Sequence, residues 1–358
     1  MPASSVDTFF ACSLMVVLIV SAMVSTTKVV QPYLTDLANM NGVERYRGFA
    51  EYLLLGTGSP SNWGRVEDVT PTAFGLASET QPPYALDIDK VSRLNGNNVY
   101  SITYQEILAA LGTTDVSFNI KIRPLFEVFI NLNSNQTNGA NTTYNFQITT
   151  SKSGSPVLAW LQSYAIVGTY IDSVSSSTDS NGASSADVNL PNSQNGTALL
   201  LVLAKAKADS QIVSFNVYSF GHNSEAPEPN GTFLQPSPLN HVLNVSFLDP
   251  DVNVSNAYVF TYSYNFNLTQ TASGNQTVEY NVPDLLEACP MMLVLNGNNG
   301  STSFAEWTAY PQLSLEIGAD FGDLITRSKA VALTHVVSIN SALYEFVITC
   351  RGVQGYFA

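Results

Sequence analysis

Apolar side chains recur with a period of two through most of the chain after Asp115. Such an alternation puts successive side chains on opposite faces of a strand, so that one face can be buried while the other meets water. The runs are rich in β-branched and aromatic residues, and turn residues separate them. Examples are VSFNIKI, FEVFINL, TYNFQIT, IVSFNVYSF and AYVFTYSYNFNL. We therefore expect an all-β region of about 240 residues, enough for two β-sandwiches.

A stretch rich in Pro, Asn and Gly, GHNSEAPEPNGTFLQPSP, divides this β region. These residue types are typical of loops and linkers. The sequence thus predicts a first immunoglobulin-like sandwich over residues 115–221 and a second over residues 238–358. Ahead of them, TYQEILAAL has helical spacing and ends at Gly112, so we expect a small mixed αβ segment over residues 57–114.

The N-terminal stretch carries no charge from Thr8 to Thr27. As a helix it would span about 30 Å, the thickness of the apolar core of a bilayer. Apolar residues continue at helical spacing to about residue 40, and GVERYRGFAEYLLL then resumes the pattern. We expect a long hydrophobic helix with an amphipathic extension over residues 1–56. The predicted fold class is α+β, mainly β.

This predicted helix has three interpretations. A secretory signal peptide should begin with basic residues, yet the first basic residue is Lys28, after the apolar run. For a single-pass anchor, the positive-inside rule would place the N-terminus outside the cell. The large sequon-bearing region downstream must also be outside, and one membrane pass cannot satisfy both demands, so this interpretation is strained. The third interpretation is a helix that packs against copies of itself.

The overall charge limits the possible partners. Net charge is -14, only 12% of the residues are charged, and no Lys or Arg lies between residues 208 and 326. Without a basic patch to hold phosphates, nucleic-acid binding is not expected. A polar but weakly charged, acidic surface fits an extracellular location.

Asn-x-Ser/Thr sequons begin only at residue 135 and several lie in turn-like contexts. We expect them to accept N-linked glycans on an exported region. The predicted acceptors are Asn135, Asn141, Asn195, Asn230, Asn244, Asn253, Asn267, Asn275 and Asn299.

Two cysteines, Cys289 and Cys350, lie in the β region. They could form a disulfide in an oxidising compartment, and the alternative is a pair of buried free thiols.

No motif for catalysis, phosphate binding or zinc is present, so we predict no enzyme activity, no cofactor and no metal. The stretch from Asp249 to Asn253 resembles half of a calcium loop but lacks its later ligands, and an Asx-rich turn is the simpler interpretation. The run Tyr258, Phe260, Tyr262, Tyr264 and Phe266 places five aromatic residues on one strand face. That face belongs either to an ordinary sandwich core or to a subunit interface.

SVDTFFACSLMVVLIVSAM resembles the N-terminal segment of archaeal type IV pilin-like surface proteins. EYLLLGTGSPSNWG, YALDIDKVSRL and THVVSINSALYEFVI are also similar to that group. The resemblance implies a subunit that is held in the membrane by its N-terminal helix and then forms a homopolymer through it. Asp7 could pair with the amine of an adjacent subunit or simply mark the helix end. The helix residues implied in assembly are Asp7, Phe9, Phe10, Leu14, Val17 and Leu18.

Three functions follow as hypotheses. The first is a structural subunit of an extracellular, pilus-like filament with glycosylated β domains on its outside. The second is a single-pass surface-layer protein or adhesin. The third is a membrane-anchored hydrolase whose carboxylates come from distant strands.

Overall fold

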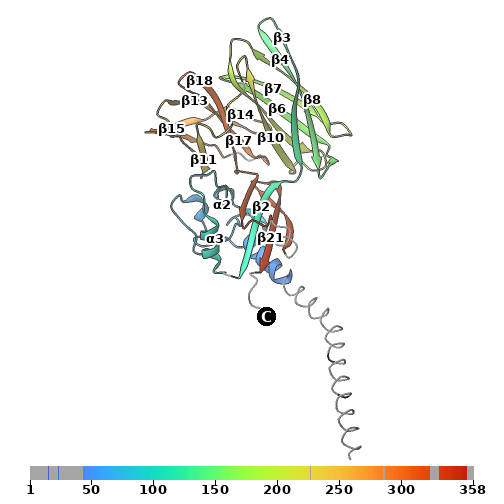
Figure 1. Cartoon of the computed structure of the whole chain (residues 1–358), viewed down its shortest axis with the longest axis vertical. Coiled ribbons are helices and arrows are strands. Elements are labelled where there is room, and N and C mark those ends of the chain that lie inside the picture. The colour runs from blue at the N-terminus through green and yellow to red at the C-terminus, as the bar shows by residue number, and fades with distance from the viewer. Residues whose placement is uncertain are drawn as a thin grey trace, which may run out of the picture. The chain divides into compact units, whose positions relative to one another are not determined.

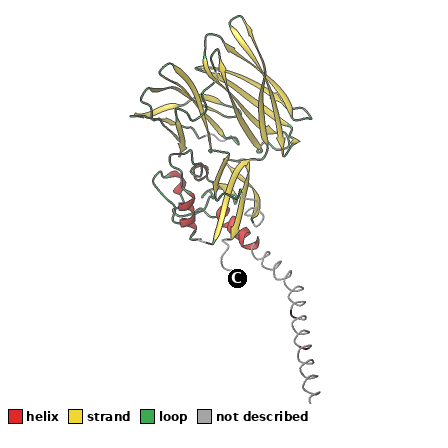
Figure 2. Cartoon of the chain, viewed as in Figure 1, coloured by secondary structure: helices red, strands yellow, loops and turns green. Residues whose placement is uncertain are grey.

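A computed structural model describes residues 43–113, 115–225, 227–284, 287–322 and 330–352, together with Met15 and Met23. The chain separates into two compact units, residues 1–50 and residues 51–358. Strands make up most of the second unit, and its helices are short (Figures 1 and 2). Residues 43–55 are helical, as the resumed pattern predicts.

The predicted fold class is wrong in its helical part. None of the helices in the described ranges is long and apolar enough to cross a membrane. The proposed assembly residues Asp7, Phe9, Phe10, Leu14, Val17 and Leu18 lie outside the described residues. An apolar helical pattern is a local signal, whereas most of the stability of a helix in a protein comes from packing its apolar face on a partner. The described chain is a β protein with short helices.

Both ends of the second unit contribute to one five-stranded sheet, which we call the base sheet. β2 pairs with β21 along its whole length and with β19 on its other side. Residues 315–352 therefore join the segment before the first sandwich instead of the predicted second sandwich. Alternation fixes which face of a strand is buried but not which strand it pairs with. The strands are, in sheet order, β1 (Ala85–Leu86), β20 (Val331–Ile339), β21 (Ala342–Gly352), β2 (Val116–Pro124) and β19 (Leu315–Gly318).

Two short helices of the base, α2 (Ile88–Ser92) and α3 (Tyr104–Leu111), lie between β1 and β2 in the sequence, and the 3-10 helix η1 (Trp63–Arg65) precedes β1. Thr103 and Glu106 form a reciprocal capping box at the start of α3, and Gly112 ends it in the left-handed conformation. The predicted helix closed by Gly112 is confirmed.

The first sandwich packs two sheets over one apolar core. Its outer strands lie close to one another across the sheets. The Ser214 hydroxyl of β10 donates to the Phe126 carbonyl beside β3 at 2.7 Å, and the Asp172 carboxylate of β7 accepts from the Asn189 N–H of β8 at 2.8 Å. These contacts cover strand edges that would otherwise be open to pairing. The strands are β3 (Glu127–Asn138), β4 (Asn141–Lys152), β5 (Ser155–Pro156) and β8 (Ala183–Pro191) in one sheet, and β10 (Val213–His222), β9 (Gly196–Ala206), β6 (Ala159–Val167) and β7 (Tyr170–Ser177) in the other.

The second sandwich has its own core between two four-stranded sheets. Two sandwiches were expected, and this coarse prediction is confirmed. One sheet contains β11 (Gln235–Leu239), β12 (Val242–Ser246), β16 (Thr277–Asn281) and β15 (Thr269–Gly274). The other contains β14 (Asn265–Asn267), β13 (Val252–Phe260), β17 (Met291–Asn299) and β18 (Thr302–Tyr310).

A third apolar cluster joins the two sandwiches face to face. Leu199, Leu201 and Leu203 of β9 contribute from one side, and Phe260 and Met292 from the other. The facing strands β9 and β17 are consequently buried on both sides, which explains their continuous apolar sequences.

The cluster between the sandwiches takes in only part of the aromatic run from Tyr258 to Phe266, for which the sequence allowed either a sandwich core or a subunit interface. Tyr258 and Phe260 are buried in the cluster, whereas Tyr264 is 56% and Phe266 36% exposed. The interface that the run serves is thus one between two sandwiches of the same chain.

A buried carboxylate fastens the base to the second sandwich. Asp89 of α2 accepts from the Tyr310 hydroxyl at 2.6 Å and from the Asn240 N–H at 2.8 Å. Burial raises the pKa of Asp89, and both hydrogen bonds oppose that rise.

Candidate functional site

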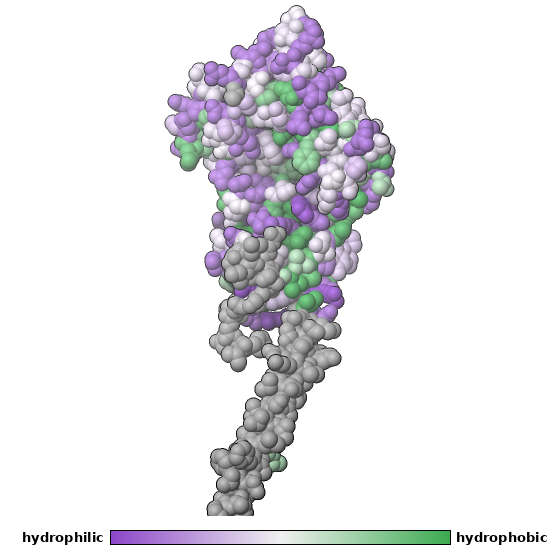
Figure 3. All heavy atoms as spheres, turned by 45° about the vertical axis from the view of Figure 1, so that its right-hand side comes forward, coloured by the Kyte–Doolittle hydropathy of each residue, from purple (hydrophilic) through white to green (hydrophobic). Residues whose placement is uncertain are grey.

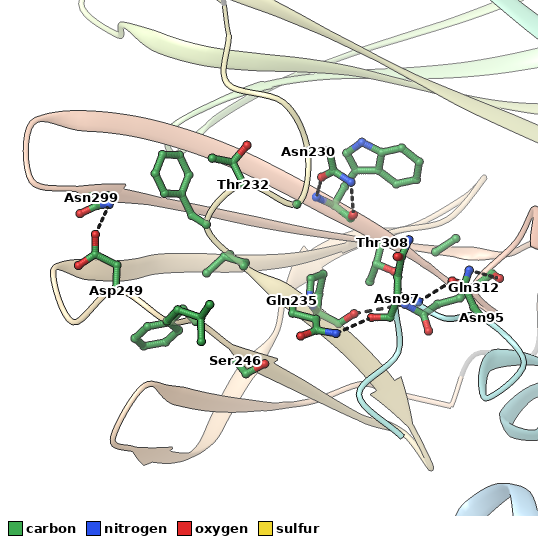
Figure 4. A pocket seen from close by; sticks show the side chains of 18 of the residues that line it. Asn95, Asn97, Asn230, Thr232, Gln235, Ser246, Asp249, Asn299, Thr308 and Gln312 are labelled. Atoms are coloured by element: carbon green, nitrogen blue, oxygen red, sulfur yellow. Dashed lines mark hydrogen bonds between the residues drawn. The ribbon is translucent and has the colours of Figure 1, made fainter. Parts of the chain in front are cut away.

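A cleft of about 870 Å³ opens where a loop of the base meets the second sandwich. The base contributes Asn95 and Asn97, which follow α2. The second sandwich contributes the segment before β11, the end of β12 and the end of β18. Figure 4 shows amide side chains along the length of this cleft.

One end of the cleft is built on a network of amide groups centred on Gln312. The buried Gln312 side chain accepts from Asn98 Nδ2 at 2.7 Å and donates to Thr308 Oγ1 at 3.1 Å. Its backbone carbonyl accepts from Asn95 Nδ2 at 3.0 Å. Gln235 Nε2 adds a bond to the Asn97 carbonyl at 3.3 Å. Because the bonds cross from the base to β11 and β18, they fix the two walls relative to each other.

Asn230 positions the loop that forms another wall. Its side-chain oxygen accepts from the Trp307 N–H at 2.8 Å, and its Nδ2 donates to the Trp307 carbonyl at 3.1 Å. The amide therefore pairs with β18 as a neighbouring strand would, and it satisfies backbone groups at the edge of the sheet.

Glu306 holds the same loop from inside. It is 1% exposed, and its carboxylate accepts from the N–H groups of Phe233 at 2.7 Å and Leu234 at 3.1 Å. Burial raises the pKa of Glu306, while the backbone hydrogen bonds lower it in part. Sequence reasoning missed this residue. The available signal was an acid inside the apolar strand FAEWTAY, where a charge needs partners.

The lining is nearly free of charge. Among the described residues that line the cleft, Asp249 is the one ionisable side chain. It accepts from Asn299 Nδ2 at 2.8 Å and from the Asp251 N–H at 3.0 Å, and these bonds lower its pKa. The Asx turn expected at Asp249 is present. Phe233, stacked on Phe304 at 5.1 Å between centroids, and Phe247 add apolar surface. The cleft thus offers neutral donors and acceptors beside apolar faces, without a pair of groups for acid–base catalysis.

All nine predicted glycan acceptors lie in the two sandwiches. Two of them, Asn230 and Asn299, line the cleft. Asn244 is half-buried and donates to the Tyr100 hydroxyl at 2.8 Å. The remaining acceptors are exposed: Asn135, Asn141, Asn195, Asn253, Asn267 and Asn275.

Cys289 and Cys350 are buried free thiols in different parts of the fold. Cys289 belongs to the cluster between the sandwiches, whereas Cys350 lies on β21 opposite Phe118 in the base sheet. Burial raises the pKa of both thiols to about 12. The structure does not bring the two together as a disulfide.

The stretch that divides the β region contains His222, which is the last residue of β10 and so belongs to the first sandwich. His222 is buried, with Nδ1 2.9 Å from the Tyr144 hydroxyl and Nε2 3.1 Å from the Pro191 carbonyl. Within the described ranges, no group of three His, Cys, Asp or Glu residues could hold a metal ion.

Comparisons with known proteins identify no relative. No family model and no curated protein matches the chain. Among solved structures, HBP35 of Porphyromonas gingivalis is similar with a TM-score of 0.21 and 9% identity, over 55% of this chain and 64% of that one. Red sea bream transglutaminase is similar with a TM-score of 0.21 and 12% identity, over 57% of this chain and 32% of that one. Similarities this weak carry no argument about fold or function, and the chain spans less than two thirds of either protein.

Proposed function

We propose that this chain is a glycosylated recognition protein displayed on the cell exterior, of the adhesin type. The distribution of sequons supports this proposal. All nine lie between residues 125 and 314, and none lies in residues 51–124 or 315–352, which share the base sheet. The potential glycan sites thus follow the three-dimensional division of the chain.

The surface chemistry agrees with an exterior location. Lys152, Lys205 and Lys207 are the only Lys or Arg residues between 125 and 314. On the face that Figure 3 shows, hydrophilic and near-neutral residues cover most of the sandwiches. The sheet-on-sheet cluster between the sandwiches gives the rigid support that a recognition surface needs.

Labelling of intact source cells tests the proposal. A membrane-impermeant amine reagent should modify exposed Lys152, and mass mapping should find glycans on the exposed sequons. Lys90, which is 1% exposed and donates to the Thr57 and Ala77 carbonyls at 2.8 Å, should stay unmodified until the protein is unfolded. Labelling only after cell lysis, with every sequon bare, would overturn the proposal.

The cleft lends no support to the hydrolase hypothesis or to the filament hypothesis. A hydrolase needs a second catalytic group beside Asp249, and the cleft lining supplies none among its described residues. Filament formation rests on residues 1–40, of which the structure describes Met15 and Met23 alone, and it stays a prediction.

A further inference from the structure

We propose that the cleft between the base and the second sandwich binds a neutral saccharide chain. This inference rests on the proposed function, because it names the class of ligand that the exterior recognition protein would take. The cleft volume, about 870 Å³, is within the range of small-molecule sites.

The chemistry of the lining selects the ligand. Asn97, Gln235 and Thr232 present amide and hydroxyl groups, which both donate and accept hydrogen bonds. A sugar hydroxyl has the same dual character, so these groups match it without any charge. Phe233 and Phe247 provide apolar surface of the kind that the C–H face of a sugar ring can cover. An anionic ligand would instead meet Asp249 and a chain of net charge -14.

The wall of the cleft is organised before any ligand arrives. Glu306 holds the Phe233 and Leu234 N–H groups, and Asn230 is fixed to the backbone of Trp307. Ordering a loop on binding reduces affinity, so a loop that is already held retains more of the interaction free energy.

The saccharide could come from either of two sources. Asn230 and Asn299 line the cleft and are sequons, so a glycan on this chain could fill it. A glycan from another molecule has the same chemistry. If the chain's own glycan is the ligand, the cleft of the glycosylated protein is already filled. If the ligand is a glycan of another molecule, that cleft is free.

Titration calorimetry with neutral hexasaccharides of glucose, mannose and N-acetylglucosamine tests the proposal, with an oligogalacturonate as the acidic comparison. The full chain is used in two forms, glycosylated protein from its source and protein from a host that does not glycosylate. Binding of a neutral hexasaccharide by both forms indicates a foreign ligand. Binding only by the unglycosylated form indicates that the chain's own glycan fills the cleft. Ser301→Ala removes the Asn299 sequon, so it should restore binding by the glycosylated form if the glycan on Asn299 fills the cleft.

Site variants separate the cleft from the rest of the surface. The double variant Asn97→Ala with Gln235→Ala should weaken binding about tenfold or more, since it removes two amide side chains that line the cleft. Gln211→Ala, an exposed amide on the first sandwich, should leave affinity unchanged. Thermal unfolding of each variant verifies that it is folded.

Three results would overturn the proposal: no binding of any neutral hexasaccharide by the unglycosylated form, equal loss of affinity in the Gln211 variant, or tighter binding of the oligogalacturonate. None of them affects the surface labelling that tests display on the cell exterior. Failure of the saccharide site and failure of the proposed function are therefore distinguishable.

Discussion

Glu306 is an acid in an apolar strand, and its role is to accept hydrogen bonds from the loop that lines the cleft. Replacing it with Ala leaves the partly buried N–H group of Phe233 and the buried N–H group of Leu234 without this acceptor. Each such group costs about 1–3 kcal/mol, so we expect Glu306→Ala to lower the free energy of unfolding by at least that amount. Glu306→Gln keeps one acceptor oxygen and should cost less. Urea denaturation checks whether Glu306→Ala lowers the free energy of unfolding more than Glu306→Gln does.

The raised pKa of Glu306 also makes stability depend on pH. The folded protein keeps the proton to a higher pH than the unfolded chain, whose value is near 4.5. The contribution of this group to stability therefore decreases as the pH rises from 4.5 through the folded pKa. Relative to Glu306→Gln, the wild-type protein should lose stability across that window. If the unfolding free energies of the wild type and Glu306→Gln differ by the same amount at every pH, the raised pKa of Glu306 is contradicted.

The two buried cysteines predict a lack of thiol reactivity. With pKa values of about 12 and at most 3% exposure, Cys289 and Cys350 hold little thiolate at pH 8. We expect no reaction with iodoacetamide in the native state and complete reaction of both in urea. The chain has a third cysteine, Cys12, and peptide mapping distinguishes its reaction from that of Cys289 and Cys350. A peptide pair joined by a disulfide in non-reduced protein would refute this prediction.

At the scale of the element, α3 owes its start to the capping box. The Glu106 carboxylate accepts from the Thr103 N–H at 2.7 Å, and this bond lowers the pKa of Glu106. We expect Thr103→Ala to destabilise α3 by about 1 kcal/mol, seen as faster amide hydrogen exchange in the helix. Thr113→Ala, which lies beyond the C-terminal end of the helix, serves as the control.

The capping box of α3 should become less stabilising at acidic pH. Because the folded pKa of Glu106 lies below its ordinary value of 4.5, its contribution is present above that pH and disappears as the pH falls through the folded pKa. Exchange of the first-turn amides of α3 should accelerate over that range. In Thr103→Ala the acceleration should be smaller.

At the scale of the whole molecule, the cluster between the sandwiches should determine cooperativity. Phe260 is fully buried there, whereas Phe266, six residues later in the same aromatic run, is 36% exposed. We expect Phe260→Ala to cost about 3–5 kcal/mol and to separate the unfolding of the two sandwiches in calorimetry. Phe266→Ala should cost about 1 kcal/mol or less and keep the wild-type transition. Equal effects of the two variants would show that the cluster does not join the sandwiches.

Several features followed from the sequence alone because their causes are local. The period of two determined that most of the chain forms strands, Thr103 and Gly112 bounded a helix, and the sequons were visible by inspection. The predicted fold class was wrong in its helical part, because none of the helices in the described ranges is long and apolar enough to cross a membrane. Most of residues 1–42, where the long helix was expected, lie outside those ranges.

Tertiary structure alone decided how these pieces combine. It placed β21 beside β2, more than two hundred residues earlier in the chain, buried Phe260 but exposed Phe266, and brought Asn97 opposite Gln235 in the cleft. Alternation specifies the face of each strand and is silent about its neighbours, because the pairing of distant strands depends on how whole apolar faces pack. Sequence therefore determined the strands of this protein, and packing determined its site.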